Sequence, residues 1–204
     1  MMDFFFKGGP IMYPLLLCSL ISLTVIIERI IFWMREGKRK DQHLVDEILS
    51  HTEKGDYQKA SEIAGGCGDY VAKVLFCGLA HRDFSLISAL EMAAAQEVKR
   101  MKRYLVILDT MITMAPLLGI LGTVMGIINS FDLLGSAGIE HPRAVTAGIA
   151  QALITTATGL AIAILTLIPY NYFLSKRDDA ISDIEKYGTN LEIVFKKNKS
   201  VETE

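Results

Sequence analysis

Cysteine, histidine and an excess of charge of either sign are all scarce in this sequence of 204 residues. There are three cysteines and four histidines, and 21 basic residues nearly balance 23 acidic ones, for a formal net charge of −2. So few cysteines without paired spacing exclude a disulfide scaffold. The balanced charge offers no overall basic excess to indicate a nucleic-acid partner.

Motifs for common catalytic and metal sites are missing as well. The sequence contains no P-loop, no HExxH and no GxSxG, so nothing indicates an ATPase or a hydrolase. Cys67, Cys77 and His81 could in principle ligate a metal, but a fourth ligand and regular spacing are absent. We therefore expect no enzyme activity, no cofactor and no metal.

Long apolar runs are what the sequence does have. Hydrophobic residues make up 51% of the chain although 22% of it is charged, and the mean hydropathy is +0.34. Three runs, at 11–34, 105–131 and 145–174, are long enough to cross a hydrocarbon core of roughly 30 Å as helices. The first exceeds a signal-peptide core and lacks a small-x-small cleavage site, which favours an uncleaved anchor. The sequence predicts an all-α membrane protein with three transmembrane helices.

The distribution of lysine and arginine predicts how these helices are oriented. Segment 35–104 holds twelve basic residues and the tail 175–204 holds six, whereas 1–10 and the link 132–144 hold one each. Basic residues concentrate on the cytoplasmic side of a membrane. We therefore expect the N-terminus (1–10) and the link 132–144 to face outward, and the domain at 35–104 and the tail 175–204 to lie in the cytoplasm.

The cytoplasmic segments carry helical patterns. Short helices are predicted around 44–49, over 57–64 with Asp56 as N-cap, and over 70–80. Apolar residues then repeat every three or four positions without Gly or Pro, which predicts one helix from Leu86 through the second span to Phe131. The third helix should similarly continue past the membrane towards Phe195, so the second and third spans both extend into the cytoplasm. One chain cannot cover these apolar stripes, which favours a homo-oligomer.

Small residues line one face of the second span. Ala115, Gly119, Gly122 and Gly126 recur at helical spacing beside Pro116, and such faces let helix backbones approach closely. Gly159 lies on a comparable face of the third span. Packing alone explains these glycines, because GxxxG by itself is a weak signal.

Polar residues cluster in the third span. Gln151, Thr155 and Thr158 share one face, and Thr156 lies about 100° away from that face. A threonine hydroxyl can bond the carbonyl four residues earlier, so each alone can be structural. Together with Thr123 of the second span, they also suit a polar lining between helices, and both interpretations stay open.

Charged residues in the spans occur only near the expected cytoplasmic ends. Glu28 and Arg29 are adjacent, so we expect them to point in different directions and to reach the interface as snorkelling side chains. Asp109 lies about one turn inside the second span on the same face as Thr113, and either a functional or an interfacial role fits it. Nothing near the middle of the membrane titrates. If protons cross here, another chain has to carry them.

Two segments resemble a known family. Segment 115–131 (APLLGILGTVMGIINSF) resembles the second-span motif of the ExbB/TolQ/MotA proton-channel family, and 148–160 (GIAQALITTATGL) resembles its third-span motif. The order of three spans, large loop and long tail matches too. The resemblance implies a homopentamer in the inner membrane whose pore holds the single spans of an ExbD/TolR-like dimer. It also implies a TonB-like protein, or TolA in the TolQ branch, as a further partner.

The resemblance also assigns residues. Thr123 and Thr156 match the family's pore threonines, which face an aspartate of the partner. At Gln151 the family often has glutamate, and glutamine cannot titrate. The implied function is a channel subunit that energises a TonB-like protein for uptake across the outer membrane. The alternatives are a TolQ-like subunit for envelope integrity and a non-conducting membrane scaffold. A MotA-like stator is less favoured, because those members have an extra N-terminal span.

Overall fold

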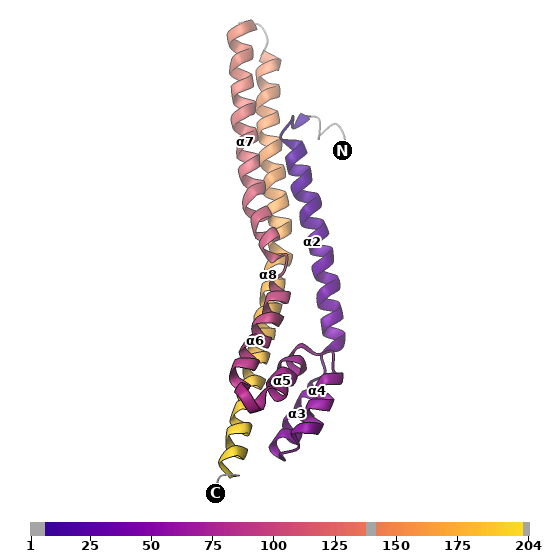
Figure 1. The fold of residues 1–204 in the computed structure, drawn as a ribbon. Coiled ribbons are helices and arrows are strands. Elements are labelled where there is room, and N and C mark those ends of the chain that lie inside the picture. The colour runs from indigo at the N-terminus through magenta and orange to yellow at the C-terminus, as the bar shows by residue number, and fades with distance from the viewer. Residues whose placement is uncertain (1–6, 138–141, 202–204) are drawn as a thin grey trace. The chain divides into compact units, whose positions relative to one another are not determined.

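The fold is described by a computed structural model that covers residues 7–137 and 142–201. All secondary structure in these two ranges is helical, which confirms the predicted all-α class. The helices are α2 (Met12–Arg39), α3 (Gln42–Glu53), α4 (Tyr57–Gly66), α5 (Tyr70–Ala80), α6 (Arg82–Lys102), α7 (Leu105–Ala137) and α8 (Pro142–Val201), as Figure 1 shows. They form two compact units. Unit 1 takes residues up to Arg29 and Tyr104–Phe173, and unit 2 takes Ile30–Arg103 and the residues from Leu174 onward.

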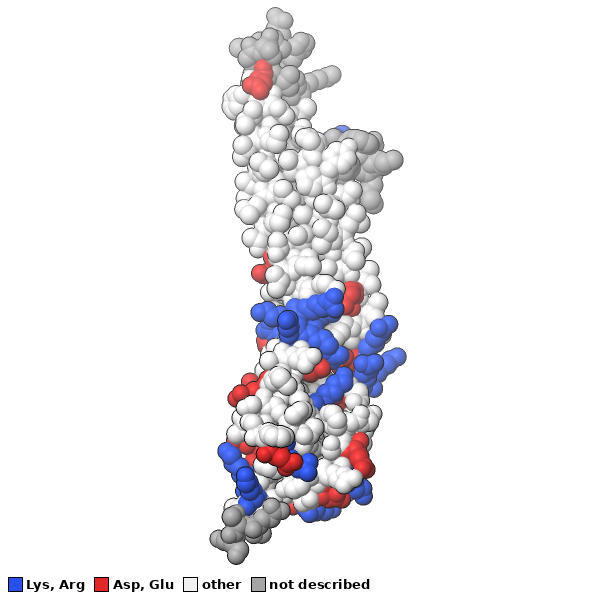
Figure 2. Space-filling model, viewed as in Figure 1, with Lys and Arg blue, Asp and Glu red and all other residues white. Residues whose placement is uncertain are grey.

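Unit 1 contains the candidate membrane spans. Three stretches are long and apolar enough to cross a membrane, and they lie within Met12–Arg39, Arg82–Asp132 and Thr146–Ser200. In unit 1, α7 and α8 lie side by side and pack with α2, where one buried cluster joins Met12, Leu15 and Ala115. Large apolar side chains such as Leu17 and Leu117 are 59% exposed, and the visible surface of this unit is almost free of charge (Figure 2). An apolar exterior of this kind suits lipid or further protein.

Unit 2 is built like a small water-soluble domain. Side chains of α3, α4, α5, α6 and α8 form one buried core that includes Ile48, Leu75, Leu79 and Leu191. Aspartates begin the short helices: the Asp56 carboxylate accepts a hydrogen bond from the Lys59 backbone N–H at 3.3 Å. Such side-chain caps satisfy amide donors that a helix leaves free at its start. The three predicted short helices and the Asp56 cap are therefore confirmed.

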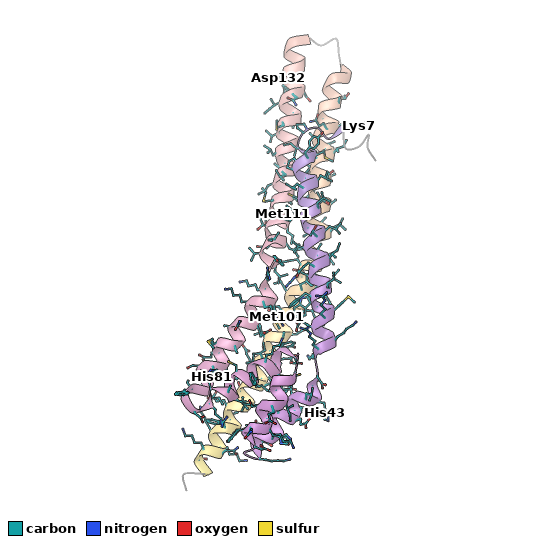
Figure 3. The ribbon with its side chains drawn as sticks, turned by 45° about the vertical axis from the view of Figure 1, so that its right-hand side comes forward. Lys7, His43, His81, Met101, Met111 and Asp132 are labelled. Carbon is teal, nitrogen blue, oxygen red and sulfur yellow. The ribbon has the colours of Figure 1, made fainter. Side chains whose placement is uncertain are left out.

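The predicted continuous helix from Leu86 to Phe131 is wrong. Its regular part does start at Leu86, because Ser85 has extended backbone with φ −162°. However, α6 ends at Lys102 and α7 begins at Leu105. Between them Tyr104 adopts φ 67°, which is uncommon for a bulky residue and ends an α-helix. Met101 and Met111, labelled in Figure 3, lie on either side of this break.

The third long helix extends further than its predicted span. Helix α8 runs for 60 residues and includes Pro169, so the helical continuation past Leu174 to Phe195 is confirmed. Helices also enter the predicted link 132–144 from both sides, since α7 reaches Ala137 and α8 starts at Pro142. The remaining link, 138–141, lies outside the described residues. The membrane orientation of these elements stays a prediction.

Candidate functional site

Helices α7 and α8 of unit 1 approach each other closely because glycines face the contact. A Cβ atom added to Gly119 would lie 3.0 Å from the Thr156 Cα and 3.1 Å from the Thr155 carbonyl oxygen. One added to Gly126 would lie 2.8 Å from the Gly148 carbonyl oxygen, too close for a real side chain. These neighbours are backbone atoms that cannot swing away. The glycines therefore set the spacing of the α7–α8 interface.

Gly159 supplies the same close approach from the α8 side. A Cβ there would clash with the Ala115 carbonyl and would lie 3.2 Å from the Gly119 Cα. Pro116 lies inside α7 and is partly buried. Proline lacks the N–H that would otherwise bond the carbonyl four residues earlier.

Thr156 links the two helices through its hydroxyl. Its Oγ1 donates to the Gly119 carbonyl oxygen at 3.0 Å, from α8 to α7. The side chain is partly buried. A hydroxyl that bonds a neighbouring helix, rather than its own, keeps a polar group at the α7–α8 interface with lone pairs left to accept another bond.

Thr155 occupies the space that Gly122 leaves open. A Cβ on Gly122 would lie 2.6 Å from the Thr155 Cβ. The Thr155 side chain is fully buried, and its hydroxyl donates to the Ala152 carbonyl oxygen at 2.8 Å within α8. Its contacts are those of a packing residue.

Thr123 lies on a groove between α7 and α8. It lines this groove with Ile127 and Ser130 of α7 and with Ala152 and Leu153 of α8. Its hydroxyl donates to the Ile120 carbonyl oxygen at 2.5 Å. Thr123 follows Gly119 by one helical turn, so Thr123 and Thr156 both belong to the α7–α8 interface.

Gln151 has a different neighbour. A Cβ on Gly9, whose φ is +70°, would lie 2.8 Å from the Gln151 Cδ. The Gln151 side chain therefore lies against the turn that precedes α2. Thr158 is partly buried and bonds the Ile154 carbonyl oxygen of its own helix at 2.8 Å. Gln151, Thr155 and Thr158, which we expected to form one polar face, therefore each contact a different neighbour.

Asp109 is exposed near the start of α7. Its backbone carbonyl accepts the Thr113 hydroxyl at 3.1 Å, and within the described ranges no bond to its carboxylate is found. Asp109 and Thr123 are 14 residues apart, which is close to four helical turns, so they share a face of α7 about 21 Å apart along the axis. The structure places Thr123, Thr155 and Thr156 together, and Gln151 and Asp109 elsewhere in unit 1.

The adjacent charges at the end of the first span differ from our expectation. The Arg29 guanidinium pairs with the Glu28 carboxylate through two contacts at 2.5 and 2.7 Å, so the two side chains do not point apart. Arg29 is only 2% exposed, and its guanidinium lies 5.5 Å from the Tyr104 ring centroid. Arg29 is therefore buried in unit 1 instead of snorkelling. Sequence spacing missed this contact, although a charge pair inside an apolar run was its signal.

The candidate metal ligands form no metal site in the described residues. His81 Nδ1 lies 3.0 Å from the Cys77 carbonyl oxygen, a backbone contact. Within residues 7–137 and 142–201, no group of three or more His, Cys, Asp or Glu side chains could hold a metal ion.

Comparison with known proteins adds independent information. Residues 70–186 match the model of the MotA/TolQ/ExbB proton channel family. The chain is 36% identical to putative biopolymer transport protein ExbB-like 1 of Synechocystis sp., over 96% of this chain and 79% of that protein. It is 32% identical to ExbB-like 3 of the same organism, over 93% and 92%. Tol-Pal system protein TolQ of Pseudomonas aeruginosa is 33% identical over 52% of this chain and 46% of TolQ.

Proposed function

The chain belongs to the MotA/TolQ/ExbB proton channel family, and we propose that it is the channel subunit of an ExbB–ExbD type complex driven by the proton-motive force. In this proposal five copies surround the single spans of an ExbD/TolR-like dimer in the cytoplasmic membrane. The N-terminus is periplasmic and the C-terminus is cytoplasmic. The complex transmits force to a TonB-like protein for uptake across the outer membrane.

One observation supports the need for such a partner. The α7–α8 interface contains threonine hydroxyls, yet the sequence has no carboxylate, imidazole or amine between Asp109 and Asp132 or between Thr146 and Phe173. A hydroxyl can accept and donate hydrogen bonds but does not carry a proton by titrating at ordinary pH. The proton carrier in the middle of the membrane therefore has to come from another chain. Thr123 and Thr156 would face it.

The proposal also gives roles to the remaining residues. Gln151 stands where the family often has glutamate, so in this chain it would bond neighbouring groups without relaying a proton. Thr155 would hold α8 against Gly122. Asp109, exposed on the same face of α7 as Thr123, would take part at the cytoplasmic end of the path, because an ionisable group within a span is costly unless it is used.

Replacing the Thr156 hydroxyl tests the proposal. The full chain is co-expressed with its single-span partner, and proton-dependent uptake is measured in cells along with proton flux in proteoliposomes. Thr156→Val keeps the shape of the side chain and removes the bond to Gly119; we expect at least a tenfold loss of flux with the complex still assembled. Thr156→Ser should restore most of the flux, because the hydroxyl returns.

Thr166→Val is the matched control. Thr166 lies in α8 too and is buried, and its hydroxyl bonds the Ile162 carbonyl oxygen of its own helix at 2.7 Å. This variant should conduct normally. Full flux in Thr156→Val would refute the pore role, and unchanged flux in Asp109→Asn would return Asp109 to an interfacial role.

A TolQ-like function is the second candidate. The similarity to the Pseudomonas aeruginosa protein, 33% identity over 107 residues, favours it. The two functions differ in phenotype: loss of a TolQ-like subunit should weaken the cell envelope, whereas loss of an ExbB-like subunit should block TonB-dependent uptake. A non-conducting scaffold would leave proton flux at background in every variant, including the wild type.

A further inference from the structure

Four basic side chains of unit 2 have no role in the proposed channel. Arg35 and Lys38 lie near the end of α2, and Lys99 and Lys102 lie near the end of α6. All four are exposed, and within the described ranges none forms an ion pair or hydrogen bond. We call these four residues the basic edge.

Neighbouring basic residues are paired, which distinguishes them from the basic edge. Lys40 Nζ lies 2.7 Å from the Asp183 carboxylate, and Arg177 lies 2.7 Å from Asp178. Arg100 lies 2.9 Å from the buried Glu36 carboxylate. Acidic side chains are therefore available in unit 2, and the basic edge is left without them in a chain whose net charge is −2.

The packing of unit 2 joins the helix ends that carry the two halves of the basic edge. Arg35 and Lys38 are three residues apart on α2, as are Lys99 and Lys102 on α6, so each pair shares one helix face. The Arg100–Glu36 ion pair joins these two helix ends, α6 to α2. The Arg100 guanidinium also lies 5.4 Å from the Phe32 ring centroid. On the face drawn in Figure 2, lysine and arginine gather on one part of unit 2.

The chain connects the basic edge directly to the membrane spans. Arg35 follows the predicted end of the first span at residue 34, and Lys102 comes three residues before α7 begins at Leu105. Both helix ends should therefore reach the same membrane surface. Negatively charged phospholipid headgroups attract such juxtamembrane cations, and the attraction falls off within a Debye length.

We propose that the basic edge binds the headgroups of anionic phospholipids in the cytoplasmic leaflet. This inference rests on the proposed membrane orientation but not on proton conduction. The lysine ammonium groups and the Arg35 guanidinium can each donate to phosphate oxygens. A lipid phosphate is the acceptor most consistently present near the membrane surface, so it explains why no acidic side chain in the described part of the chain compensates these four charges.

Lipid titration of the purified full chain tests this proposal. Protein in a neutral detergent is titrated with phosphatidylglycerol or phosphatidylcholine, and bound lipid is counted by native mass spectrometry. We expect phosphatidylglycerol to bind preferentially, with an affinity that falls as salt is raised. Lys99→Gln/Lys102→Gln and Arg35→Gln/Lys38→Gln should each weaken this binding about 25-fold, or about fivefold per charge removed.

Lys54→Gln/Lys59→Gln is the matched control. Both lysines are exposed: Lys54 directly follows α3 and Lys59 lies in α4, so both are distant from the spans in sequence. The variant removes two positive charges, as each test variant does. It should bind phosphatidylglycerol like the wild type. Equal loss in the control would overturn the proposal, since binding would then follow net charge alone.

Two further measurements separate competing ligands. Inorganic phosphate at millimolar concentration should not displace the lipid; displacement would indicate a free-phosphate site and refute the lipid as occupant. The oligomer mass should be the same for wild type and variants. A changed mass would mean that the basic edge binds acidic side chains of a second copy, which would also overturn the proposal. Neither readout depends on proton flux, so the proposed channel function can fail separately.

Discussion

The two units of this chain solve the problem of burial in different ways. In unit 2, seventeen buried residues form one cluster, whereas one buried cluster in the described part of unit 1 joins Met12, Leu15 and Ala115. Unit 1 leaves large apolar side chains exposed along α2, α7 and α8, whereas unit 2 encloses most of its apolar residues. Apolar side chains can remain exposed in this way only where lipid or other subunits cover the outside of unit 1.

The two units also differ in how their polar side chains are hydrogen-bonded. In unit 1 most of the threonine hydroxyls bond backbone carbonyls of their own helix, as Thr110 and Thr166 do. In unit 2 carboxylates cap helices and pair with cations, as Asp69 and Asp183 do. Hydrocarbon requires each span to satisfy its own polar groups, while water allows longer-range pairs. The comparison indicates that each unit is adapted to its own solvent.

The largest difference in stability between the two units should appear when a large side chain is removed from the core of unit 2. Leu79 is fully buried there, so Leu79→Ala should destabilise the unit by about 2–5 kcal/mol. Leu17→Ala removes the same atoms from a side chain of α2 that is 59% exposed, and it should cost far less. Thermal unfolding followed by circular dichroism in detergent measures both. Equal losses would mean that the units do not differ in how they are stabilised.

A second, smaller difference in stability should appear when a glycine of each unit is replaced by alanine. Gly159→Ala forces a Cβ against backbone atoms of Ala115 and Gly119 in unit 1, so it should cost about 1–3 kcal/mol through overpacking. Gly188 of unit 2 has nothing within 4 Å of such a Cβ, and Gly188→Ala should stabilise α8 by up to about 1 kcal/mol. The melting temperatures of the two variants should shift in opposite directions. A drop in both would indicate that Gly188 is also a packing position.

The smallest effect concerns pH and is confined to unit 2. Burial raises the pKa of Asp183, but hydrogen bonds from Lys40 and Tyr70 outweigh it and hold that pKa below its usual range. Burial and the bond to Asp183 raise the pKa of Tyr70, which therefore keeps its proton and remains the donor. Because the folded-state pKa of Asp183 is lowered, its stabilisation is present above about pH 4. It should be lost as the pH falls further.

Comparing wild type with Asp183→Asn isolates this contribution. We expect a difference in unfolding free energy of about 1 kcal/mol at pH 7, because the pair with Lys40 is partly exposed. The difference should shrink below pH 4, where the wild-type carboxylate becomes protonated. Hydrogen exchange of the α5 and α8 amides provides the measurement. A difference that stayed constant down to pH 3 would exclude Asp183 as its source.

Much of the fold could be predicted because its signals are local. Apolar length identified the three spans, and Asp56 marked the start of α4. The break between α6 and α7 could not be predicted in this way. It depends on Tyr104, a residue with no turn preference, and on the Arg29 guanidinium that lies against its ring. A contact between residues 75 positions apart leaves no mark in a local pattern.

The candidate site was predictable in composition but only partly in arrangement. Small residues and threonines at helical spacing marked α7 and α8, and the structure brings Thr155 and Thr156 to the glycines of α7. Helical spacing alone could not separate Gln151 from Thr155, because both lie near the same face. Their neighbours decide their contacts: Gly9 for Gln151 and Gly122 for Thr155.

By itself the sequence determined that this chain is helical, that three stretches suit hydrocarbon, and that no titratable group lies in the middle of them. These properties follow from composition and short-range spacing, which act within one helix. Only the tertiary structure decided that Arg29 is buried with Glu28, that the long second helix is interrupted at Tyr104, and that Thr156 bonds Gly119. These features depend on which distant helices meet, and burial changes the energy of a charge or a hydroxyl more than its position in the sequence does.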